Sequence, residues 1–167
     1  MSSKTYPTLS LETELVEAGS RFVIGIDEVG RGAIAGPVAV GAALIDSQDA
    51  RWREPWPVKL RDSKLLAEPV REEIYEPVRA WAAGSAVGMV SALDIDRLGI
   101  VESLARAASA AIAQLLEDQD LRAAIANDGA IVLLDAQGRF SRISVRGTGS
   151  NKGSPCNIGD SALAGMG

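Results

Sequence analysis

The sequence contains no histidine and only one cysteine, Cys156. Without histidine, the chain lacks the usual ligand set of zinc hydrolases and the general base of a Ser-His-Asp triad. One cysteine cannot form an internal disulfide, and residues 1–9 have no export pattern, so we expect a reducing, cytoplasmic setting. Carboxylates therefore remain as the main candidates for catalysis or metal binding.

Long apolar runs and an excess of positive charge are also absent. No apolar run approaches the roughly 20 residues that span a bilayer, so no membrane partner is expected. The net charge of −5 lowers the expectation of a nucleic-acid partner. It does not exclude one, because a local basic strip or bound metal cations can also contact phosphates. The 167 residues, 47% of them apolar, suffice for one domain with a sizeable core.

The order of apolar runs and helical spacings predicts a mixed α/β domain. The glycine-rich segment 27–36 would join the first two strands as a hairpin, and Pro77 would kink or divide the second helix. The expected elements are a helix at 11–20, strands at 21–26 and 38–45, a helix at 67–82, a strand at 84–90, a helix at 94–119 and a strand at 130–134.

The carboxy-terminal residues 138–167 have a different composition. They contain seven of the 17 glycines, five serines and a single acidic residue, Asp160. Apart from Ile143 and Val145, no helical or strand period is visible there. We therefore expect residues 1–137 to form the folded core and 138–167 to be a poorly ordered tail.

Three acidic residues stand at the ends of predicted strands. Asp27 and Glu28 are adjacent, and they can reach one site only if the strand ends or twists there, because neighbouring side chains point to opposite faces. Asp135 follows the last predicted strand, and if the two strands are neighbours the three carboxylates converge at one edge of the sheet. Such a set suits magnesium or manganese. Each aspartate can equally be explained by the turn that follows a strand.

Two polar segments are candidates for substrate contacts. Gly30, Arg31 and Gly32 would allow positive φ and close backbone approach, and Arg31 could meet a phosphate or pair with a carboxylate. An ordinary tight turn explains the same pattern. Ser63 and Lys64 precede a predicted helix, where they are either a phosphate contact at the rim of the site or a helix cap and a surface charge.

Four segments together resemble one protein family, ribonuclease HII. Residues 25–32 (GIDEVGRG), followed by 35–38 (AGPV), strongly resemble its opening signature. Further similar segments are 60–66 (LRDSKLL), 95–100 (IDRLGI) and 132–135 (VLLD). The resemblance covers residues 21–135 in the same order.

The resemblance implies a ribonuclease H-like fold and a site of four carboxylates that binds Mn²⁺ or Mg²⁺. Asp27, Glu28 and Asp135 match three of these carboxylates, and the segments Gly30-Arg31-Gly32 and Ser63-Lys64 match substrate-binding positions. The implied activity is an endoribonuclease that cuts the RNA strand of RNA–DNA hybrids and single ribonucleotides in duplex DNA. Two-metal hydrolysis would leave 5′-phosphate and 3′-hydroxyl ends.

The carboxy-terminal third departs from the family pattern. The fourth acid belongs to a lysine-small-aspartate motif: one alignment places Ser154 there, and the other places Asp160 there without the lysine. The family's later helices find no match, so the alternative is a catalytically impaired remnant that at most binds hybrid duplex weakly. A third possibility is a phosphate-binding module on the turns of 147–153, although their spacing fits no standard phosphate loop.

Overall fold

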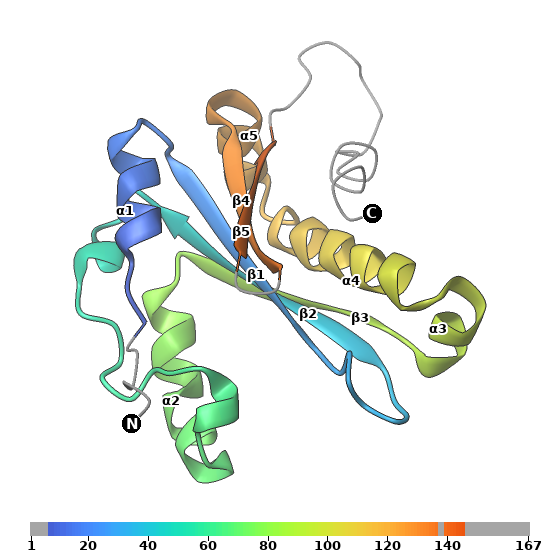
Figure 1. The fold of residues 1–167 in the computed structure, drawn as a ribbon. Helices are drawn as coiled ribbons and strands as arrows, with labels where there is room; N and C mark the ends of the chain where they lie inside the picture. Colours follow the sequence, from blue (N-terminus) through green and yellow to red (C-terminus); the bar gives the residue numbers. More distant parts are fainter. Residues whose placement is uncertain (1–6, 137–138, 146–167) are drawn as a thin grey trace.

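The computed structural model describes residues 7–136 and 139–145, with side chains placed for residues 7–134. Its centre is a five-stranded mixed sheet in the order β3-β2-β1-β4-β5 (Figure 1). β2 pairs antiparallel with both β1 and β3, β4 runs parallel to β1, and β5 is antiparallel to β4. The strands are β1 (Phe22–Val29), β2 (Val38–Asp46), β3 (Gly84–Val90), β4 (Ala130–Ala136) and β5 (Arg139–Val145). The predicted mixed α/β class and the β1–β2 hairpin are confirmed.

Helices connect these strands and cover the sheet. They are α1 (Ser10–Glu17), α2 (Glu68–Trp81), α3 (Ala92–Leu98), α4 (Ile100–Leu115) and α5 (Gln119–Asp128), and the 3₁₀ turns η1 (Ala50–Arg53) and η2 (Ser63–Leu65) precede α2. Among the helices of the described residues, none is long and apolar enough to cross a membrane.

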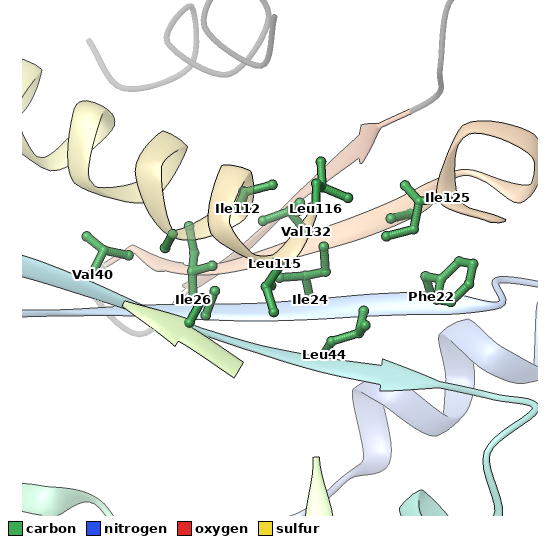
Figure 2. Packing of buried hydrophobic residues seen from close by; sticks show 14 of the residues in the cluster. Phe22, Ile24, Ile26, Val40, Leu44, Ile112, Leu115, Leu116, Ile125 and Val132 are labelled. Carbon is green, nitrogen blue, oxygen red and sulfur yellow. The ribbon is translucent and has the colours of Figure 1, made fainter. Parts of the chain in front are cut away.

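The main core lies between the sheet and α4. Alternate residues of β1, namely Phe22, Ile24 and Ile26, face this core and pack with Ile112 and Leu115 of α4 (Figure 2). This alternation follows from the two-residue period of a strand. It assigns the even-numbered positions of β1 to the face that α4 covers.

A smaller cluster lies on the opposite face of the sheet. Val23 of β1, Ile45 of β2 and Leu133 of β4 pack there against Leu15 of α1 and Trp52 of η1. These contacts lie toward the amino-terminal end of β1. The odd-numbered positions farther along β1 are Gly25, Asp27 and Val29, and all three are exposed.

One helix prediction was wrong, and another was right in its boundaries. The single helix expected at 94–119 is divided, because Gly99 takes φ +78° between α3 and α4, and the chain turns again before α5. Asp118 begins α5 by accepting hydrogen bonds from the N–H groups of Asp120 and Leu121. The helix expected at 67–82 is α2, and Pro77 does not divide it.

Two strand predictions were also incomplete. β1 continues to Val29, so it contains Asp27 and Glu28 instead of ending before them. Residues 139–145 form β5 through pairing with β4, although their sequence has little strand alternation. Hydrogen bonding to β4 therefore makes residues 139–145 a strand that their own sequence pattern does not predict. Residues 146–167 lie outside the described part of the chain, and the expectation of a poorly ordered tail remains a prediction for them.

Candidate active site

Asp27 and Glu28 lie inside β1, at the end where the β1–β2 hairpin turns. Their pairing with β2 is regular, with Asp27 opposite Gly41 and Glu28 opposite Val40. Because the register has no break, the two side chains leave the strand on opposite faces. Asp27 is exposed on the face opposite α4, and Glu28 is half-buried. The end or twist of the strand that we expected to unite the two carboxylates is therefore absent at these positions.

The carboxylate of Asp27 has a local partner. The Glu28 N–H donates a hydrogen bond to Asp27 Oδ1 at 2.9 Å. Among the side chains placed for residues 7–134, no cationic one hydrogen-bonds to Asp27. Its carboxylate therefore retains lone pairs that face solvent and are open to a cation.

Asp135 lies in β4, the strand next to β1. The parallel register pairs Ile26 with Leu134, so the next positions along both strands, Asp27 and Asp135, are side by side. Neighbouring strands are about 4.8 Å apart. The condition set for convergence, that the two strands are neighbours, is met at the backbone level for Asp27 and Asp135. Among the side chains placed for residues 7–134, no group of three His, Cys, Asp or Glu residues is arranged to hold a metal ion.

The turn after Glu28 depends on glycine at two positions. Gly30 has φ +95°, and a Cβ atom there would lie 2.6 Å from the carbonyl oxygen of Pro37. Gly36 has φ +118°. Gly32 lies in open space and is not among the positive-φ glycines of the described residues. Of the Gly30-Arg31-Gly32 run, only Gly30 is therefore required by the backbone conformation.

Arg31 lies beside the acidic pair. One guanidinium nitrogen, Nη1, is 3.8 Å from Glu28 Oε1, and the Arg31 side chain is 55% exposed. An ion pair this long and this exposed contributes little to stability. Arg31 therefore remains available to an incoming phosphate, one of the two roles expected from the sequence.

Ser63 and Lys64 form part of η2. Asp62, and not Ser63, caps this turn: its carboxylate accepts a hydrogen bond from the Lys64 N–H at 2.9 Å. The side chains of Ser63 and Lys64 are exposed. No hydrogen bond or ion pair described within 7–134 joins them to Asp27 or Glu28, so their role as phosphate contacts stays a prediction. Ser154, Asp160 and the turns of 147–153 lie outside the described residues.

Known proteins match the segment of the chain that contains Asp27, Glu28 and Asp135. The sequence profile described as ribonuclease HII matches residues 24–138. The chain belongs to the ribonuclease HII family. Together with the mixed sheet, this membership confirms the ribonuclease H-like fold class and the family suggested by the GIDEVGRG motif.

Individual ribonuclease HII proteins match the same part of the chain. The protein of Paracoccus denitrificans is 42% identical over 113 residues, which are 66% of this chain and 49% of that protein. The protein of Streptomyces coelicolor is 41% identical over 110 residues, 65% of this chain and 45% of that protein. The crystal structure of ribonuclease H2 from Pyrococcus horikoshii is 31% identical, with a TM-score of 0.40, and the match covers 47% of this chain and 36% of that one. The chain thus spans about half the length, or less, of these ribonuclease HII relatives.

Proposed function

We propose that this chain carries the carboxylate-bearing part of an endoribonuclease that cuts the RNA strand of RNA–DNA hybrids and single ribonucleotides in duplex DNA. The observation that supports the proposal most directly is the register of β1 and β4, which puts Asp27 beside Asp135 within the segment that matches the ribonuclease HII family. Glu28 and Arg31 follow on the same hairpin. The products would have 5′-phosphate and 3′-hydroxyl ends.

The donor set fits a hard divalent cation. Asp27 and Asp135 are side by side on neighbouring strands and offer carboxylate oxygens, the ligands that Mg²⁺ and Mn²⁺ prefer. Glu28 leaves β1 on the opposite face and would join them only through a local twist of the strand. Asp27 is exposed, and within residues 7–134 its carboxylate accepts a hydrogen bond only from the Glu28 N–H, so a cation can reach it there without the breaking of an ion pair. When bound, such ions lower the pKa of a water nucleophile and stabilise the leaving oxygen. We propose that Asp27 and Asp135 together hold at least one such ion.

The other residues of the hairpin would bind the substrate backbone. Arg31 would exchange its 3.8 Å contact with Glu28 for a phosphate oxygen, which accepts a charge-assisted hydrogen bond. This exchange would also release the Glu28 carboxylate toward a cation. Gly30 would hold the turn in the conformation that places Arg31 next to the carboxylates.

The test is cleavage of a labelled DNA duplex that contains one ribonucleotide, with Mg²⁺ and then Mn²⁺, by purified chain 1–167. We expect a cut on the 5′ side of the ribonucleotide. Asp27→Asn should reduce the rate by at least roughly a hundredfold, because it removes a charged ligand of the cation. Asp120→Asn is the matched control, since Asp120 is an exposed carboxylate in the first turn of α5. An unchanged rate for Asp27→Asn would overturn the catalytic assignment.

A second candidate is a catalytically impaired remnant that at most binds hybrid duplex weakly. It is favoured by the alignment that places Ser154, and not an acid, at the fourth carboxylate position of the family. Calorimetric titration with Mn²⁺ separates the two candidates when circular dichroism shows a folded sample. Binding of Mn²⁺ that Asp27→Asn abolishes, without any cleavage, would support the remnant.

A further inference from the structure

The β1–β2 turn carries an apolar side chain at its tip. Ile34 has a relative exposure of 107%, the highest of the exposed large apolar side chains among the described residues. Figure 1 shows the turn extending beyond the rest of the sheet. An isolated exposed apolar residue is common on protein surfaces, so the surroundings of Ile34 must decide whether it has a role.

The conformation of the turn holds Ile34 in this exposed position. Gly30 and Gly36 flank it with positive φ, and the Gly30 position is closed by the backbone of Pro37. Within the turn, the Ala33 N–H donates a hydrogen bond to the Gly30 carbonyl oxygen at 3.1 Å. Gly30 and Pro37 therefore approach each other at the base of the turn, and Ile34 lies between them in the sequence.

Further exposed apolar side chains lie at the same end of the sheet. Val29 of β1 and Met89 of β3 are 68% and 62% exposed, and the register aligns both with Ala39 of β2. The adjacent row contains Asp27 and Val87. Apolar surface therefore extends from the base of the turn to the edge strand, immediately beside one of the candidate metal ligands.

We propose that Ile34 contacts the substrate duplex by packing against sugar edges in its minor groove. This inference rests on the proposed function and names a specific contact for it. The 2′-hydroxyl that distinguishes RNA from DNA lies in the minor groove, and proteins that enter this groove often use apolar side chains. Ile34 is three residues from Arg31, so the same turn presents a cation for the phosphates and an apolar side chain for the sugars.

The test is equilibrium binding of chain 1–167 to a fluorescently labelled DNA duplex with one ribonucleotide, measured by anisotropy in Ca²⁺. Ile34→Ser should raise Kd by roughly three- to tenfold, the effect of losing part of the burial of an isoleucine side chain. Ile34→Leu should keep Kd within about twofold, since it retains the apolar volume. Val101→Ser is the matched control, because Val101 is a 53% exposed β-branched residue of α4.

Salt dependence distinguishes an apolar contact from an electrostatic one. Ile34→Ser should leave the slope of log Kd against log salt concentration unchanged, because no counterion is released at an apolar contact. Arg31→Ala should reduce the slope by about one, as expected for a lost phosphate contact.

The outcomes separate this inference from the proposed function. If the folded wild-type chain binds the duplex and Ile34→Ser binds equally well, the role of Ile34 is refuted and the proposed function stands. If Val101→Ser weakens binding as much as Ile34→Ser, the contact is not specific to the turn and the inference is also refuted. If the folded wild-type chain binds no duplex, both the proposed function and the role of Ile34 are refuted.

Discussion

Gly88 of β3 marks the closest approach between the sheet and α4. A Cβ atom at position 88 would lie 1.9 Å from the Ala107 carbonyl oxygen and 2.7 Å from the Ala111 nitrogen. Both are backbone atoms of a helix and cannot rotate away. Gly88→Ala therefore requires α4 to move by more than 1 Å before the 1.9 Å contact reaches an ordinary 3.4 Å.

Such a movement would disturb the most tightly packed part of the core. Ala107 and Ala111 are fully buried, and the same helix contributes Ile112 and Leu115 to the main cluster. A gap of 0.5–1 Å already loses about a quarter to a half of each van der Waals contact. With the usual overpacking cost, we expect Gly88→Ala to lower the free energy of unfolding by about 3–5 kcal/mol.

The assay is urea denaturation followed by circular dichroism. Gly25→Ala is the matched control: Gly25 also lies within a strand, and its Cβ position meets nothing within 4 Å. We expect Gly25→Ala to change stability by less than about 0.5 kcal/mol. If Gly88→Ala were also within about 0.5 kcal/mol of wild type, the close packing of β3 on α4 would be incorrect.

Two further predictions concern polar groups far from the carboxylates. Asp118→Ala removes the acceptor of two N–H groups at the start of α5. It should lower the free energy of unfolding, measured by urea titration, by about 1 kcal/mol. An unchanged urea midpoint would show that this helix cap contributes nothing to stability. Hydrogen bonds from the Arg51 side chain and backbone lower the pKa of Asp49 in the folded protein below its value in the unfolded chain. The folded state is therefore stabilised by the charged Asp49 at pH values above the unfolded pKa, and this stabilisation is lost as the pH falls through the folded pKa. Asp49→Asn should therefore weaken the fall of the melting temperature on acidification, and an identical acid profile would refute the assignment.

Much of the fold follows from local patterns in the sequence. The alternation of Phe22, Ile24 and Ile26 marks one face of a strand, and the glycine-rich segment after it predicts a hairpin; both features are present. The boundaries between helices were harder to predict because they depend on single residues. Gly99 ends α3 within a continuous run of helix-forming residues, and Asp118 begins α5 only one turn after α4 ends.

The strands that were missed depend on contacts distant in sequence. Nothing in residues 139–145 alternates strongly, yet they complete the sheet because β4 offers an unpaired edge. The extension of β1 through Asp27 and Glu28 has the same cause, since β2 supplies partners as far as Ala39. Acidic residues are unfavourable within strands, and only pairing with a neighbour overrides that preference.

The candidate site is divided between local and long-range determinants. Glu28, Arg31 and Ile34 belong to one hairpin, so residues close in sequence, with Gly30 and Gly36 at positive φ, set their relative positions. Asp135 reaches the site only through the parallel pairing of β4 with β1, which forms across more than a hundred residues of chain. The β1–β2 turn, which we propose to contact the substrate, should therefore be less sensitive than metal binding to changes that displace β4 from β1. For this reason, a core variant such as Gly88→Ala should weaken Mn²⁺ binding before it removes the salt-dependent contact of Arg31 with a duplex.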